Sequence, residues 1–93
     1  MHPDRRNTHP SSSLVLYGTT ACTLCDRLEQ MVRPHLEARG LHLTKRDIST
    51  NRAWRQTFGH RIPVLVRDGQ VLLEGRPEED EIRALFTRSE SRS

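Results

Sequence analysis

The sequence lacks the features that define several large classes of protein. No apolar run approaches the roughly 20 residues that a membrane-spanning helix needs, so we expect no membrane partner. The first residues, MHPDRRNTHPSSS, contain no apolar core of a secretory signal, which favours a reducing, cytoplasmic setting in which cysteines rest as thiols. Neither GxGxxG nor the phosphate-binding pattern GxxxxGK followed by Ser or Thr occurs, and no internal repeat is present.

Lysine and aromatic residues are also scarce. Fourteen arginines accompany a single lysine, Lys45, and the net charge is +3. The arginines alternate with acidic residues instead of forming one basic patch, and only four aromatic side chains are available to stack on bases. We therefore expect no nucleic-acid partner.

The apolar pattern predicts one small α/β domain over residues 14–86, with a disordered tail at 1–13 and a polar tail at 87–93. Its elements follow the order βαβαββα. They are a strand at 14–17, a helix from Leu24 that Pro34 kinks or interrupts before Gly40, a strand at 41–47, a helix carrying Trp54 and Phe58, a hairpin at 63–73 that turns at Asp68-Gly69, and a helix whose first residue is Pro77. Leu24, Trp54 and Phe58 are predicted core residues.

The only two cysteines, Cys22 and Cys25, lie three residues apart where the first strand gives way to the first helix. A bridge between them closes almost no loop, so it adds little stability by constraining the unfolded chain. At a helix N-terminus, unpaired N–H groups and the helix dipole favour a thiolate at Cys22. Cys25 shares its helix face and can attack a mixed disulfide on Cys22. The spacing predicts Cys22 as nucleophile and Cys25 as resolving thiol.

Three other uses of this cysteine pair stay open. The pair can form half of a zinc site, although His35 and His42 follow at spacings unlike those of a zinc finger. Both cysteines can pack inertly near the helix end as small hydrophobic residues. Cys22 can also hold an iron-sulfur cluster that is shared between two chains.

With a CxxC motif at a strand-to-helix join, and Arg61-Ile62-Pro63 opening an antiparallel hairpin, the chain resembles the thioredoxin-fold superfamily. It looks most like the small glutaredoxin-like proteins, over the segments LYGTTACTLCDRLE, HRIPVLVRDGQ and EGRPEEDEI. The resemblance implies a central four-stranded mixed sheet flanked by helices. It also implies a cis Ile62-Pro63 bond beside the cysteines, with the backbone of Ile62 free to pair with a substrate strand.

The chain departs from the patterns of both related families. Where thioredoxins have a Trp before the first cysteine and a buried acid six residues before it, this chain has Ala21 and Leu16. Dithiol glutaredoxins have a Lys three residues before the first cysteine, where this chain has Thr19. They place Pro-Tyr between the cysteines and hold the glutathione carboxylate with a Gly-Gly and acid segment; the corresponding residues here are Thr23-Leu24 and Gly75-Arg76. Arg76 and the N-terminus of the last helix can still receive a carboxylate, so glutathione remains a candidate co-substrate.

The sequence supports two functions of different classes. The first is a monomeric thiol-disulfide oxidoreductase, active in electron transport and cell redox homeostasis, that reduces protein or glutathione mixed disulfides with electrons from a donor and holds no cofactor or metal. Its predicted substrate-binding residues are Thr20, Ala21, Thr23, Leu24, Arg61, Ile62, Pro63, Gly75 and Arg76. The alternative is a redox-silent binding module that docks an extended partner segment along the hairpin edge and the groove at Ile62.

Overall fold

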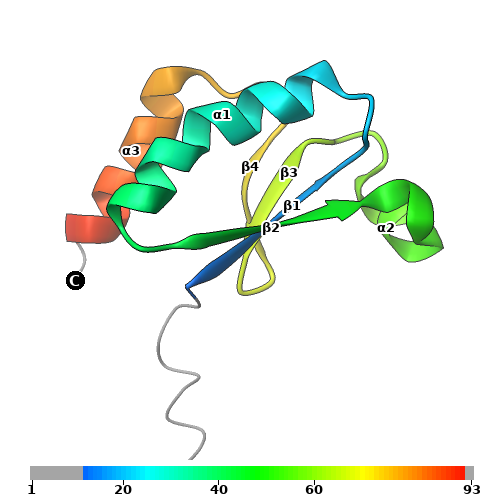
Figure 1. Ribbon diagram of the computed structural model, residues 1–93, viewed down its shortest axis with the longest axis horizontal. Coiled ribbons are helices and arrows are strands. Elements are labelled where there is room, and N and C mark those ends of the chain that lie inside the picture. The colour runs from blue at the N-terminus through cyan, green and yellow to red at the C-terminus, as the bar shows by residue number, and fades with distance from the viewer. Residues whose placement is uncertain (1–11, 92–93) are drawn as a thin grey trace, which may run out of the picture.

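The computed structural model describes residues 12–91 (Figure 1). The elements follow the predicted βαβαββα order, with one short 3₁₀ turn, η2, after the second strand. They are β1 (Ser13–Gly18), α1 (Thr23–Ala38), β2 (His42–Asp47), η2 (Ile48–Thr50), α2 (Arg52–Phe58), β3 (Val64–Arg67), β4 (Gln70–Glu74) and α3 (Glu79–Ser91).

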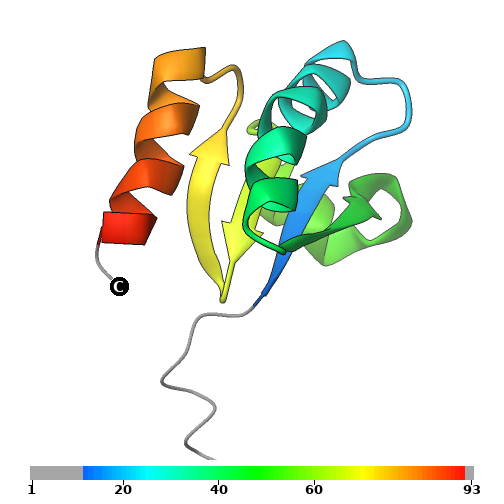
Figure 2. The ribbon, with the colours of Figure 1, turned by 60° about the vertical axis from the view of Figure 1, so that its left-hand side comes forward.

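The four strands form one mixed sheet in the order β2-β1-β3-β4. Strand β1 runs parallel to β2 and antiparallel to β3, and β3 pairs antiparallel with β4. Helices α1 and α3 cover one face of this sheet, whereas α2 lies beyond the end of β2 and away from both of them (Figures 1 and 2). The predicted four-stranded mixed sheet flanked by helices is confirmed.

The core lies between the sheet and the two helices α1 and α3. Side chains alternate along β1, so Leu14 and Leu16 are buried beneath the helices while Tyr17 points to the opposite face. The core cluster comprises Leu14, Leu16, Leu28, Val32, Leu36, Leu65, Leu73, Ile82 and Phe86. On the opposite face, the Tyr17 ring stacks on Phe58 at 4.3 Å between centroids and meets Trp54 edge-on at 5.5 Å. Trp54 and Phe58 are therefore half-buried in a small aromatic cluster outside the main core.

Helix α1 decides one of the two alternatives for Pro34 and corrects the prediction for Leu24. It continues through Pro34, which is exposed and costs the helix a single backbone hydrogen bond, and ends at Ala38. Leu24 is 38% exposed and does not join the core, whereas Cys25 is 6% exposed. The buried stripe of α1 consists of Cys25, Leu28, Val32 and Leu36, whose spacings of three and four residues keep them on one face. Leu24 precedes that stripe by one position and is turned toward solvent.

The turn and cap residues follow local rules. Asp68 and Gly69 both have positive φ, 54° and 75°, which is the conformation of a two-residue hairpin turn between β3 and β4. Asn51 caps α2 because its side-chain oxygen accepts a hydrogen bond from the Trp54 N–H at 3.0 Å. Gly59 follows at the C-terminal end of this helix. The predicted hairpin and the predicted end of α2 are confirmed.

Several element ends differ from the predicted boundaries by one or two residues, and α3 extends further than predicted. Ser13 already belongs to β1, because the parallel ladder between β1 and β2 extends to the first residue of β2, where Ser13 pairs with His42. Helix α3 begins at Glu79, two residues after Pro77, and extends beyond Phe86 to Ser91 through its own backbone hydrogen bonds. The remaining predicted tail residues, 1–11 and 92–93, lie outside the described part of the chain. Within residues 12–91, no helix combines the length and apolar composition required to cross a membrane.

Candidate functional site

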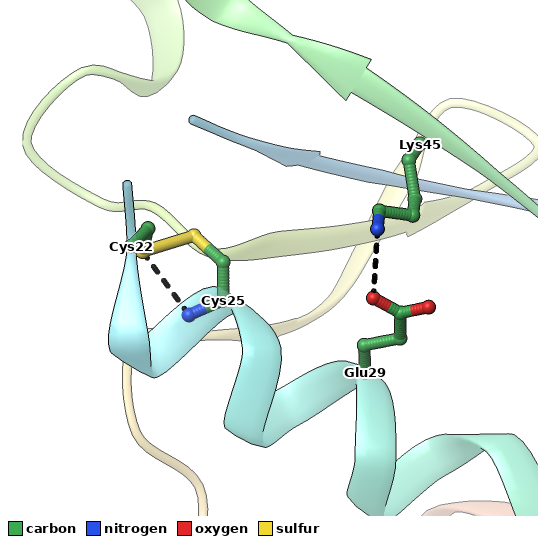
Figure 3. The surroundings of a disulfide bond; sticks show 4 residues. All are labelled: Cys22, Cys25, Glu29 and Lys45. Atoms are coloured by element: carbon green, nitrogen blue, oxygen red, sulfur yellow. Dashed lines mark hydrogen bonds and ion pairs between the residues drawn. A yellow bond between two sulfur atoms is a disulfide. The ribbon is translucent and has the colours of Figure 1, made fainter. Parts of the chain in front are cut away.

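Cys22 is the N-cap residue of α1 and has extended backbone angles, φ −132° and ψ 105°. Its sulfur accepts a hydrogen bond from the backbone N–H of Cys25 at 3.1 Å (Figure 3). The two residues form a disulfide bond, with their Cα atoms 5.2 Å apart. A cap residue and the residue three positions later lie close enough for the two sulfur atoms to bond, and the resting thiols expected in a reducing setting are the reduced form of this same pair. The structure therefore shows the oxidised state of the pair.

The two sulfur atoms have different surroundings. Cys22 is half-buried and receives the N–H of the first helical turn, whereas Cys25 is 6% exposed and continues the core stripe of α1. After reduction, the same N–H and the positive end of the helix dipole favour negative charge on the Cys22 sulfur. Burial disfavours charge on Cys25. This asymmetry matches Cys22 as the more accessible nucleophile and Cys25 as the buried second thiol.

Gly18, the last residue of β1, lies directly against the Cys25 side chain. A Cβ added at Gly18 would lie 2.6 Å from the Cys25 sulfur and 3.2 Å from its Cβ, so any larger residue at this position would force the Cys25 side chain to shift. Because Tyr17 pairs with Val64 in the antiparallel β1–β3 ladder, Gly18 and Pro63 are the next residues along the two strands. The sheet therefore brings the proline loop toward the end of β1 that abuts the disulfide.

The Ile62-Pro63 peptide bond is cis, as the resemblance implied. Pro63 is buried, and its carbonyl accepts a hydrogen bond from the N–H of Gly75 at 2.8 Å. Ile62 is half-buried, and no hydrogen bond engages its backbone among the residues that the structure describes. The structure thus joins Pro63 to Gly75 and leaves the main chain of Ile62 available to an extended segment.

The other predicted binding residues lie at the N-terminus of α1 and in the segments next to the proline loop. Thr20, Ala21, Thr23 and Leu24 are all exposed around the N-terminus of α1. Arg76 is exposed in the loop before α3.

Arg61 has partners within the chain. Its Nη2 lies 2.8 Å from Glu74 Oε1, and its guanidinium lies 5.8 Å from the centre of the Phe58 ring. The sequence analysis missed Arg27, whose Nη1 donates to the carbonyl of Pro77 at 3.1 Å and thereby ties the loop before α3 to α1.

A cavity of about 320 Å³ lies behind the disulfide, between α1, β2 and the end of β1. It is lined by Leu16, Gly18, Thr19, Thr20, Cys25, Asp26, Glu29, Lys45, Arg46 and Asp47. Glu29 Oε1 lies 2.9 Å from Lys45 Nζ, and Glu29 also pairs with Arg33 on the same helix (Figure 3). The hydrogen bond from Arg33, followed by that from Lys45, lowers the pKa of the Glu29 carboxyl below its ordinary value. Glu29 was not among the predicted site residues, although its position four residues after Cys25 places both on one helix face.

Within residues 12–91, no group of three or more His, Cys, Asp or Glu side chains is arranged to hold a metal ion. The surroundings of the disulfide can support thiol chemistry: one sulfur atom lies at a helix N-terminus, the second is buried, and a cavity with charged groups in its wall lies behind it.

The family model described as "Glutaredoxin-like domain (DUF836)" matches residues 13–87. The chain belongs to the glutaredoxin-like domain family. A search of curated protein sequences finds no match.

Solved structures agree with the glutaredoxin-like assignment. Northeast Structural Genomics target protein XcR50 from X. campestris is 26% identical with a TM-score of 0.66, over 81% of this chain and 96% of that one. A mutant thioredoxin from Halobacterium salinarum NRC-1 is 28% identical with a TM-score of 0.59, over 82% of this chain and 72% of that one. A malarial protein of 14% identity and TM-score 0.55, matching 82% of this chain and 93% of that one, shares the fold. A CxxC pair in disulfide geometry within a glutaredoxin-like domain supports a thiol-disulfide redox function.

Proposed function

We propose that this glutaredoxin-like protein is a thiol-disulfide oxidoreductase that reduces protein or glutathione mixed disulfides. The observation that carries the proposal is the asymmetry of the pair. The sulfur of Cys22 receives the N–H of Cys25 at a helix N-terminus, while Cys25 is buried directly behind it. An inert buried pair would not require one sulfur to cap the helix and remain open to solvent.

The proposed reaction has two exchange steps. The Cys22 thiolate attacks one sulfur of the substrate disulfide, which forms a mixed disulfide and releases the first substrate thiol. Cys25 then attacks the Cys22 sulfur, forms the observed Cys22–Cys25 bond and releases the second substrate thiol. The substrate gains two electrons and the protein loses two, which an external thiol donor returns.

Substrate contacts are proposed around the two loops. The main chain of Ile62 pairs with an extended substrate segment, and the exposed side chains of Ala21 and Leu24 provide apolar contact beside Cys22. Arg76 and the N-terminus of α3 can receive a glutathione carboxylate. The acidic residues Glu79, Asp80 and Glu81 in the first turn of α3 already interact with that helix end, which weakens capture of a second anion. The proposed setting is a reducing compartment such as the cytoplasm, with the chain acting as a monomer.

The proposal is tested by equilibrating the purified protein across glutathione redox buffers, trapping thiols by alkylation and counting each species by intact mass. We expect reversible conversion between a dithiol and an internal disulfide at one defined potential. The Cys25→Ser variant should accumulate a mixed disulfide with glutathione, and Cys22→Ser should form none. Two thiols that stay free across the whole range would refute the oxidoreductase and favour the redox-silent binding module.

A further inference from the structure

Cys25 must lose a proton when it attacks the mixed disulfide, and its surroundings make this loss difficult. Its side chain is 6% exposed, which disfavours a thiolate and removes direct contact with bulk water. The adjacent β1 side chain, Leu16, is apolar and cannot accept a proton. Cys25 lines the cavity behind the disulfide, and the ionisable groups in the wall of that cavity are the candidate proton acceptors.

Three carboxylates line the cavity, and they differ in their availability to Cys25. Asp47 is the last residue of β2, and its Oδ1 accepts from the Ser49 N–H at 3.0 Å and from the Ser49 hydroxyl at 2.7 Å. Asp26 follows Cys25 by one position, so it projects from a different side of the helix. Glu29 follows Cys25 by four positions, and Figure 3 shows both side chains extending from the same side of α1 toward the sheet. Glu29 is therefore the carboxylate of this cavity that shares the helix face of Cys25. Its two oxygens also pair with Lys45 and Arg33.

The cavity can hold water between the two groups. A volume of about 320 Å³ has room for several water molecules, and the hydroxyl, carboxylate and ammonium groups in its largely apolar wall can hydrogen-bond them. Lys45 fixes the Glu29 carboxylate from β2 at 2.9 Å, and Arg33 fixes it from α1. The remaining charged groups around the cavity are Arg46 from β2 and the two aspartates described above. These contacts lower the pKa of Glu29, so the carboxylate is ionised at neutral pH and can accept a proton, although it is a weaker base than a free glutamate.

We propose that Glu29 accepts, through water in this cavity, the proton that Cys25 loses when it resolves the mixed disulfide on Cys22. The S–H bond of Cys25 breaks, a bond forms between the sulfur atoms of Cys25 and Cys22, and the bond from Cys22 to the substrate sulfur breaks. The substrate sulfur leaves with the electron pair, and the proton on Glu29 returns to solvent. Lys45 is a positioning residue that keeps the carboxylate at the cavity. This inference rests on the proposed oxidoreductase function.

The test uses the full-length reduced protein and dithiobis(nitrobenzoate), a disulfide whose aromatic thiolate product is coloured. Attack by Cys22 releases the first thiolate in a phase that depends on reagent concentration. Resolution by Cys25 then releases the second thiolate in a phase whose rate is independent of the reagent concentration. We expect Glu29→Gln to slow only the second phase, by about 10- to 100-fold near pH 6. The difference should shrink as the pH rises, because hydroxide then increasingly removes the Cys25 proton without Glu29.

Two further variants separate a proton acceptor from a structural role. Glu37→Gln changes an exposed glutamate of the same helix that lies outside this cavity, and both of its phases should match the wild type at every pH. Arg33→Met removes the main contact that lowers the pKa of Glu29, so the carboxylate becomes a stronger base and the second phase should accelerate near pH 6. A slower second phase in Arg33→Met would contradict the proposal even if Glu29→Gln failed to fold.

The outcomes also separate this inference from the proposed function. If Glu29→Gln resolves the mixed disulfide at the wild-type rate throughout the pH range, Glu29 is not the acceptor, although the oxidoreductase reaction stands. If the wild type releases no second thiolate, the two-cysteine reaction itself fails.

Discussion

Replacing Gly18 with alanine tests how closely β1 supports the disulfide. The added Cβ would lie 2.6 Å from the Cys25 sulfur, where ordinary contacts begin near 3.4 Å. Gly18 does not have a positive φ, so alanine meets no backbone penalty there and the close contact is the whole effect. Overpacking of this kind costs about 1 to 3 kcal/mol.

This cost should fall mainly on the oxidised protein. In the disulfide, the bond to Cys22 fixes the Cys25 sulfur against Gly18, whereas in the dithiol the Cys25 side chain can rotate away. A penalty of about 1 to 3 kcal/mol on the oxidised form alone raises the reduction potential by about 20 to 60 mV, since 30 mV corresponds to about 1.4 kcal/mol for a two-electron couple. The Gly18→Ala protein should therefore be the stronger oxidant.

The potential is measured by equilibrating wild type and variant in the same series of glutathione buffers and counting alkylated thiols by intact mass. Gly69→Ala is the matched control, because Gly69 has a φ of 75° and an added Cβ there meets no atom within 4 Å. Its backbone strain destabilises both redox forms equally, so its potential should equal that of the wild type. A Gly18→Ala potential that also equals the wild-type value would refute the argument.

Three other substitutions test the packing and the electrostatics of α1. Leu28→Ala empties a fully buried core position and should lower the free energy of unfolding, measured in urea, by about 2 to 5 kcal/mol. Leu24→Ala changes a position that is 38% exposed and should alter the free energy of unfolding by less than about 0.5 kcal/mol. Equal losses in the two variants would contradict the assigned faces of the helix. The pKa of Glu29 is lower in the folded protein than in the unfolded chain, and it lies below 4.5 in the folded protein. The ion pairs of Glu29 therefore stabilise the fold at pH values above its unfolded pKa. This stabilisation is lost as the pH falls through its folded pKa. Glu29→Gln should therefore be less stable than wild type at neutral pH, by less than about 1 kcal/mol, and equally stable near pH 2. Urea unfolding at several pH values measures both differences. A stability difference that grew as the pH fell would contradict the direction of the Glu29 pKa shift.

Local sequence signals predicted the elements of the fold because each depends on neighbouring residues. Asp68 and Gly69 supply the two positive-φ positions of the hairpin turn, and Asn51 supplies a cap oxygen for α2. The helical spacing placed Cys22 and Cys25 within bonding reach at the start of α1. The family resemblance, and not a local signal, predicted the cis bond before Pro63.

The surroundings of the disulfide depend on packing between distant segments. The sequence could not show that Gly18 touches Cys25, since this contact forms only when α1 docks on β1. Leu24 and Cys25 are adjacent apolar residues, and the orientation of the docked helix decided which of them is buried. The pairing of Glu29 with Lys45 required β2 to lie parallel to β1 beside α1, at the edge of the sheet. The sequence by itself thus determined the elements and the reactive pair, whereas the tertiary structure decided which charges and which cavity accompany the buried sulfur, because those contacts join residues far apart in the chain.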